Sequence, residues 1–299
     1  MKKFYAIAAL ATVLVGCAKE VEDPNVAIPE TGNMVTLRAS VDNPDTKMQA
    51  DNVGAFAWQT GDVISVLNNS GKAFDFSTTG SGTTVDFTGT FASGSLGDYA
   101  MYPKHDEHEA SGSTIRFHLP TSLDWAANTT FMPMLGKISD GKASFKAVGG
   151  VLKLVCYNIP SGAVLFQFSA TNKQINGEFI IDGDEASPAI ETAAKAGSNN
   201  ETDIDFTGNY SANKVFYIPL PTGTIDGFTV SFFDSSANEL FTKTTTANLV
   251  VGRNKIILGP ALNCNVIANK VVTNDEIVSD VPSSYNSGNY SGAPALSIN

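Results

Sequence analysis

Short runs in which apolar and polar residues alternate recur along most of this chain, separated by clusters of Gly, Asn, Asp and Ser. In "VTLRASV" (35–41), the four apolar residues share one face of an extended strand and the polar residues between them share the other. Such a strand has one side for a hydrophobic core and one for water, as antiparallel sheets require. The pattern therefore predicts an all-β protein.

The number of these runs predicts two domains of similar size. About seven lie between residues 34 and 158 and about seven more between 163 and 258, and about seven strands are enough for one β-sandwich. We expect an N-terminal β-sandwich at 34–158 and a C-terminal β-sandwich at 159–260, with at most one short helix, in 184–199. Residues 261–299 contain too few apolar residues for a third domain, so they are predicted to be a tail.

The first residues have the form of an export signal. Lys2 and Lys3 precede an apolar run that ends at Val15, and this run is too short to span a membrane. The sequence "LVGC" (14–17) resembles the lipobox of bacterial lipoproteins, which implies a signal peptide at 1–16 and acyl chains on Cys17. The alternative is an ordinary signal that leaves Cys17 free. Residues 17–33 are acidic and contain proline, which predicts a flexible linker.

Charge and cysteine content limit the partners and the cross-links. The net charge is −11, and removal of the leader takes away two lysines and no acid, which lowers it to −13. Such a surface repels nucleic acid and anionic lipid, so we expect no nucleic-acid partner and membrane contact only through the anchor. Cys156 lies in an apolar run and Cys264 in the tail, which favours two free thiols over a disulfide.

The sequence contains no GxSxG, HExxH or P-loop motif. We therefore expect no enzyme and no cofactor. His105 and His108, in the acidic stretch "KHDEHEASG", are candidate metal ligands, but their spacing fixes no third ligand, and a solvated loop without metal is the preferred interpretation. His118 alternates with apolar residues and is expected on the surface. Trp58 and Trp125 are interpreted as core or rim residues, with a sugar-stacking platform as the alternative.

Several segments, in order along residues 1–260, resemble the fimbrillin-like family, the lipoprotein pilins and accessory subunits of the type V fimbriae of Gram-negative anaerobes. After the lipobox, the segments that carry the resemblance are "VTLRASV" (35–41), "TK" (46–47), "FAWQTGDVISV" (56–66), "DYAMYP" (98–103), "HLPTSLDW" (118–125), "MPML" (132–135), "FKAVGGVLKLVCYN" (145–158), "FYIPLPTGTIDGFTVSF" (216–232) and "GRNKIIL" (252–258).

The resemblance implies two transthyretin-like β-sandwich domains in tandem and a particular mode of assembly. In the family, a trypsin-like protease cuts after a basic residue in or near the first strand, and a strand from another subunit fills the groove that opens. Arg38 best fits the cut in this chain, and Lys47 is the second choice. The alternative is that Arg38 is an outward-facing residue on a permanent edge strand.

The tail supplies candidate residues for the donor strand. Its apolar residues come in adjacent pairs rather than in strict alternation, and a tail folded back on its own second domain is the alternative. The candidate donor-strand residues are Val266, Ile267, Val271, Val272, Ile277 and Val278.

The sequence thus predicts a fimbrial subunit with a structural and adhesive role. We expect it at the cell surface, anchored to the outer membrane by lipid or built into a fimbrium. Its expected partners are other fimbrial subunits, in a homopolymer or a heteropolymer, and a ligand on a host or bacterial surface. The alternative is a surface glycan-binding lipoprotein, which would need exposed aromatic side chains.

Overall fold

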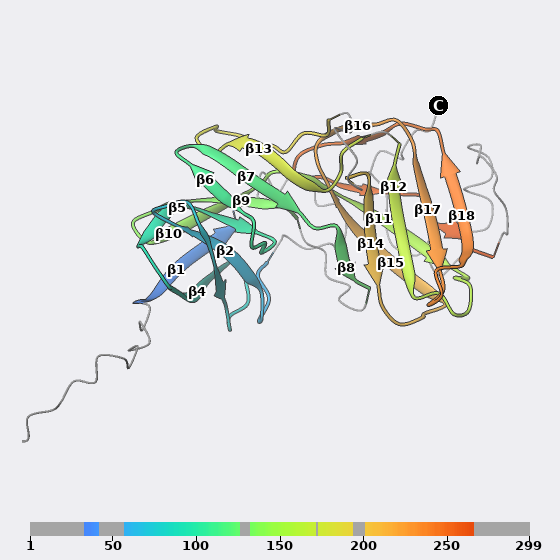
Figure 1. Ribbon diagram of the computed structural model, residues 1–299, viewed down its shortest axis with the longest axis horizontal. Helices are drawn as coiled ribbons and strands as arrows, with labels where there is room; N and C mark the ends of the chain where they lie inside the picture. Colours follow the sequence, from blue (N-terminus) through green and yellow to red (C-terminus); the bar gives the residue numbers. More distant parts are fainter. Residues whose placement is uncertain (1–32, 42–56, 126–131, 172, 194–200, 266–299) are drawn as a thin grey trace, which may run out of the picture. The chain divides into compact units, whose positions relative to one another are not determined.

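The computed structural model describes residues 33–41, 57–125, 132–171, 173–193 and 201–265, and these residues form β-strands, turns and loops without a helix (Figure 1). The prediction of an all-β fold is confirmed. Residues 184–193, part of the segment in which a short helix was expected, contain turns and bends and one isolated β-bridge. In the described part of the chain, no helix has the length and hydrophobicity needed to cross a membrane.

Strands up to Tyr157 make up the first half of the fold. They are β1 (Asn33–Val41), β2 (Val63–Asn68), β3 (Ala73–Ser77), β4 (Thr84–Phe91), β5 (Leu96–Tyr102), β6 (Glu109–Ser111), β7 (Thr114–Leu119), β8 (Ser122–Asp124), β9 (Met134–Ser139), β10 (Lys142–Ala147) and β11 (Gly150–Tyr157).

The second half begins after the turn at 158–162. Its strands are β12 (Leu165–Ala170), β13 (Gly177–Asp182), β14 (Asp203–Thr207), β15 (Asn213–Leu220), β16 (Gly223–Ile225), β17 (Phe228–Phe233), β18 (Glu239–Thr245), β19 (Leu249–Val251), β20 (Ile256–Leu258) and β21 (Leu262–Asn263).

Seven strands of the first half form a sheet that closes on itself, in the order β1-β10-β9-β5-β2-β3-β4, with β4 paired back to β1. We call it the closed sheet. All of its pairs are antiparallel except β1 with β10, which is parallel. Its interior is filled by large apolar side chains, among them Trp58, Phe87 and Phe145, which are at most 2% exposed. The Trp58 ring meets each of these phenylalanines edge-on at a centroid distance of 5.0 Å.

A three-stranded sheet, β13-β7-β6, packs on the outside of the closed sheet. Ile115 and Phe117 of β7 share a core with Leu67 and Met101, which project outward from β2 and β5. The two faces of those closed-sheet strands are therefore both buried. This is why β2 reads as a nearly continuous apolar run, "VISVLN", rather than as a strict alternation.

Most strands of the second half, together with β8 and β11 of the first half, form a sandwich of two sheets around one core, which we call the C-terminal sandwich. One sheet has the order β15-β11-β20, with β21 also paired to β11, and the other has the order β18-β17-β12-β14-β8. Phe166 of β12 stacks on Phe216 of β15 across the core, with ring centroids 3.9 Å apart, and Trp125 packs edge-on against Phe216. Residues from both sheets form this single apolar cluster.

Strand pairs cross the predicted domain boundary at residue 158 in both directions. β13, from the second half, pairs with β7 over six residues, and β8, from the first half, pairs with β14 over three. β11 also precedes the boundary but belongs to the C-terminal sandwich. The division into domains at 34–158 and 159–260 remains a prediction, and these pairings show which strands a division there would separate.

The two cysteines of the described residues lie together in the core of the C-terminal sandwich. Cys156 is 0% and Cys264 is 2% exposed, and neither forms a disulfide. Burial raises the pKa of the Cys156 thiol, and a hydrogen bond with Cys264 raises it further. Leu262, in β21, is also buried in this core. The fold therefore continues past residue 261, where the tail was predicted to begin, to the end of β21.

We predict that neither buried thiol reacts with a thiol reagent in the folded protein. Burial hinders access, and the raised pKa of Cys156 leaves little of the reactive thiolate. The measurement is mass-resolved labelling of a Cys17→Ser chain, without reductant, in buffer and in urea. We expect no label in buffer and two per chain in urea. A chain that takes up no label in urea would instead contain a disulfide.

Candidate functional site

Strand β1 closes the closed sheet, because the other six strands form a continuous row from β10 to β4 and both ends of that row pair with β1 (Figure 1, β1 in blue). It pairs with β4 from Asn33 to Ser40 and with β10 from Arg38 to Val41. Both edges of the strand are thus paired in its C-terminal half, and only the β4 edge is paired in its N-terminal half. The alternative that β1 is a permanent edge strand does not describe the half that contains Arg38.

The side chains of β1 follow the alternation that the sequence predicts. Leu37 and Ala39 are fully buried in the core of the closed sheet, and Val35 and Val41 pack against it. Thr36 and the other polar residues lie on the outer face, partly or fully exposed. The strand therefore supplies both main-chain pairing and part of the apolar filling of the closed sheet.

Arg38 is exposed through its side chain and held through its backbone. Its guanidinium forms an ion pair with Asp86 at 3.2 Å, and both side chains are more than half exposed. Its backbone N–H donates a hydrogen bond to the Gly141 carbonyl oxygen at 3.1 Å. Because proteases act on chain that is free or transiently opened, a cut after Arg38 requires β1 to be detached or not yet inserted. The exposed ion pair adds little stability.

Most of the other predicted site residues lie outside the described residues. These are Cys17, Lys47 and all six candidate donor-strand residues, Val266, Ile267, Val271, Val272, Ile277 and Val278. The lipid anchor, the second cleavage site and the donor strand remain predictions from the sequence.

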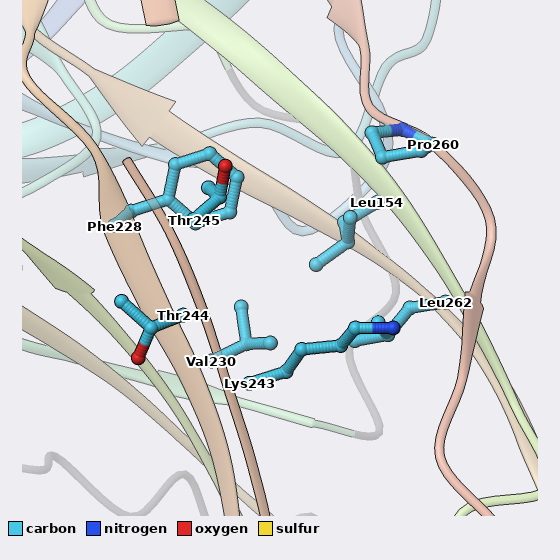
Figure 2. A pocket seen from close by; sticks show the side chains of 8 residues that line it. All are labelled: Leu154, Phe228, Val230, Lys243, Thr244, Thr245, Pro260 and Leu262. Atoms are coloured by element: carbon cyan, nitrogen blue, oxygen red, sulfur yellow. The ribbon is translucent and has the colours of Figure 1, made fainter. Parts of the chain in front are cut away.

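An apolar pocket lies beside the last described strand. It is lined by Leu154 of β11, residues of β17 and β18, and the chain at Pro260 and Leu262, and it encloses about 350 Å³ including its open mouth. Figure 2 shows the Lys243 side chain pointing toward Leu262 among the lining residues. A tail that folds back onto the C-terminal sandwich would start next to this pocket.

Neither tryptophan lies on the surface, where a sugar-stacking platform would need it. Trp58 and Trp125 are each 2% exposed, so they are core residues, as the preferred interpretation held. The only large aromatic side chain among the described residues that is strongly exposed is Tyr210, at 44%. One exposed tyrosine does not make a flat platform, and the described surface therefore gives no support to the glycan-binding alternative.

The histidines differ most from the sequence-based expectation. His118, expected on the surface, is 8% exposed, and His108, expected in a solvated loop, is 1% exposed. The alternation in β7 is real, but the outward face at His118 is covered by the loop that contains His105, whose ring stacks on the His118 ring. Alternation assigns a side chain to a face of the strand, and it does not show whether another segment covers that face.

Comparison with known proteins gives distant structural similarities. No protein-family model and no curated protein matches the sequence. The structure is similar to a provisionally assigned cell adhesion protein from Bacteroides ovatus, with 10% identity, 76% of this chain and 92% of that chain covered, and a TM-score of 0.39. For one from Bacteroides uniformis the identity is 13%, the coverage 76% and 93%, and the TM-score 0.36.

A third similar structure is the fimbrial anchor protein Mfa2 from Porphyromonas gingivalis, with 8% identity, 70% of this chain and 82% of that chain covered, and a TM-score of 0.24. Because each of these TM-scores is below 0.5, the function proposed below is inferred from the residues of this chain.

We predict that Leu37→Ala destabilises the protein by about 2–5 kcal/mol, because Leu37 is fully buried and its truncation leaves a cavity in the closed sheet. Thr36→Ala, on the exposed side of the same strand, is the matched control and is expected to cost less than about 1 kcal/mol. Urea unfolding of both variants measures the difference. Equal unfolding midpoints for the two would show that β1 is not a packed part of the sheet.

Proposed function

We propose that this chain is a lipid-delivered subunit of a cell-surface fimbrium that assembles by exchange of β1 for a strand of another subunit. The observation that carries the proposal is the position of β1. It is the first strand of the described fold, it is paired on both edges at Arg38, and it buries apolar side chains in the closed sheet. The role requires neither a cofactor nor catalytic turnover.

The first strand is the one strand of the closed sheet that a single cut can remove. A cut within any later strand leaves both pieces joined to the fold by other strands, whereas a cut in β1 separates everything before it. The segment before the cut carries Cys17, so the same cut would release the subunit from its acyl chains. One proteolytic step would thereby both release the subunit from the outer membrane and open the closed sheet for assembly.

The two candidate cuts have different structural consequences. A cut after Arg38 removes residues 33–38 and frees the β4 edge from Asp86 to Phe91, while residues 39–41 can still pair with β10. A cut after Lys47 removes all of β1, which frees the edges of both β4 and β10. The first cut leaves a site for one strand that pairs with β4. The second leaves a gap between β4 and β10, in which an incoming strand could pair with both.

An incoming strand must reproduce what β1 provides. It must pair with β4 through its backbone and place apolar side chains at alternate positions, where Val35 and Leu37 now pack. Residues 266–299 are the proposed source of that strand. Their apolar residues occur as the pairs Val266-Ile267, Val271-Val272 and Ile277-Val278, so in each pair only one side chain would enter the core.

We predict that Arg38→Gln prevents maturation and fibre formation. The change removes the basic residue that a trypsin-like protease needs, and it replaces an exposed side chain, so the fold is retained. The measurements are intact mass of the protein recovered from cells and electron microscopy of fibres. We expect wild-type chains that begin at Ala39 and Arg38→Gln chains that begin at Cys17.

Arg116→Gln is the matched control, because Arg116 is equally exposed and also pairs with one carboxylate, Glu178. It should mature and assemble as the wild type does. Wild-type chains that begin at Met48 would move the cut to Lys47. Wild-type fibres built from chains that still begin at Cys17 would contradict assembly by removal of β1.

We predict that deletion of residues 266–299 leaves a folded protein that no longer polymerises. The deletion ends beyond β21, so Leu262 and Cys264 keep their places in the core of the C-terminal sandwich. Fibre assembly is followed by electron microscopy and folding by urea unfolding. Normal fibres from the truncated chain would show that the donor strand comes from elsewhere.

A further inference from the structure

The loop between β5 and β6, residues 103–108, is held in place by buried polar contacts. The hydroxyl of Ser65, a residue of β2 that is fully buried, accepts a hydrogen bond from the His105 N–H and donates one to the His105 carbonyl oxygen, both at 3.0 Å. The backbone of His105 is thereby fixed to the closed sheet. Its side chain is directed to β7, where its ring stacks on the His118 ring.

His108 joins the same loop to β7 and uses both of its ring nitrogens to do so. Its Nδ1 accepts a hydrogen bond from the His118 backbone N–H at 3.1 Å, so its Nε2 carries the ring proton and donates to the Pro103 carbonyl oxygen at 2.9 Å. Burial lowers the pKa of His108 to about 3, so the ring is neutral at pH 7. His108 is therefore a structural residue and has no free nitrogen for a ligand.

His105, Glu107 and His118 form a cluster whose nearest ligand atoms all lie within 4.8 Å of one another. The rings of His105 and His118 are parallel to within 8°, with centroids 4.9 Å apart. The His118 Nδ1 atom lies 3.5 Å from the Glu107 Oε2 atom. On the other side of the ring, the His118 Nε2 atom lies 3.6 Å from the Oε2 atom of Glu178, which is opposite His118 in β13.

Among the described residues, the His118 ring nitrogens have no protein partner at ordinary hydrogen-bond distance. Both contacts of the His118 ring with carboxylates are longer than the roughly 2.7–3.2 Å of an ordinary N–H···O hydrogen bond. Two imidazoles and one carboxylate that converge in this way are a ligand set typical of zinc.

We propose that His105, Glu107 and His118 bind a divalent transition-metal ion, with Zn²⁺ as the ion that the ligand set favours. Bonds of about 2.0–2.2 Å in a tetrahedral site place ligand atoms roughly 3.4 Å apart, so the cluster must contract. Glu107 can provide the movement, because its side chain is 73% exposed at the loop surface. The same exposure leaves the fourth position to water.

The surroundings are suited to this coordination. Glu178 can accept a hydrogen bond from the His118 Nε2–H when Nδ1 binds the metal, which is the common carboxylate–histidine–metal arrangement. His105 must give up the 3.2 Å hydrogen bond that its Nδ1 accepts from the Glu107 N–H. Coordination through Nδ1 replaces that bond, and coordination through Nε2 moves the ring proton to Nδ1 and breaks it. This loss lowers the affinity without preventing binding.

The metal would cross-link the loop at 103–108 to β7. Both ligating histidines are already positioned, His105 by Ser65 and His118 by its strand, and Glu107 closes the site from the solvent side. The third ligand comes from a strand that follows the loop, which is why the spacing of His105 and His108 did not indicate it. The site is independent of β1 and of strand exchange.

Isothermal titration of residues 17–299 with Zn²⁺ tests the proposal. Every protein carries Cys17→Ser to remove that thiol. We expect one Zn²⁺ per chain, with binding weakened at least tenfold in both His105→Gln and Glu107→Gln. Zn²⁺ at about one hundred times the parent's dissociation constant should raise the Tm by about 5 °C in the parent and by no more than about half as much in these variants.

Asp106→Asn is the matched control, because Asp106 is in the same loop, is 82% exposed and pairs with Lys104 rather than with the cluster. It should bind Zn²⁺ as the parent does. The absorption spectrum with Co²⁺ reports the ligand type independently. Absence of saturable binding, unchanged affinity in His105→Gln and Glu107→Gln, or a spectrum of thiolate ligation from Cys156 and Cys264 would each overturn the proposal.

Discussion

The double pairing of β1 is the interaction on which the first half of the fold depends. Strands β4 and β10 are the two ends of the row formed by the other six strands, and both pair with β1, so the row without β1 would have two open edges. Closure pairs the main-chain N–H and C=O groups that would otherwise be exposed at an open sheet edge, where another chain could pair with them. Because the same strand also fills part of the core through Leu37 and Ala39, its removal would expose an edge and an apolar groove together, which is what a complementary strand requires.

The two halves of the chain are joined by strand pairing as well as by sequence. β13 extends the sheet that covers the closed sheet, and β8 extends a sheet of the C-terminal sandwich. The loop at 103–108 belongs to this covered region, and it is held by hydrogen bonds of two buried polar residues, Ser65 and His108. Buried polar groups specify a conformation because each must find its partner. His105 and His118 are therefore brought together by contacts that have no role in closing the sheet.

Much of the fold could be predicted from periodicity, and the candidate site only in part. The alternation in residues 35–41 correctly predicted the strand, its buried face and the exposed Arg38 side chain. Trp58 and Trp125 were expected in the core or at a rim, and both lie in the core. The burial of His118 was not, because periodicity of two assigns a face to each side chain and carries no information about what packs on that face. The place of Leu262 and Cys264 in the core was missed for the same kind of reason, since a strand of two residues has no measurable period.

By itself, the sequence determined that this protein is acidic, and it predicted an all-β fold and the leader of an exported lipoprotein, because these properties depend on residue type and on spacing over a few positions. Only the tertiary structure decided which strand closes the sheet, that Arg38 is held from both sides, and that His105, Glu107 and His118 converge. These are contacts between segments far apart in the chain. Their partners are selected by the packing of the whole fold, which no local pattern encodes.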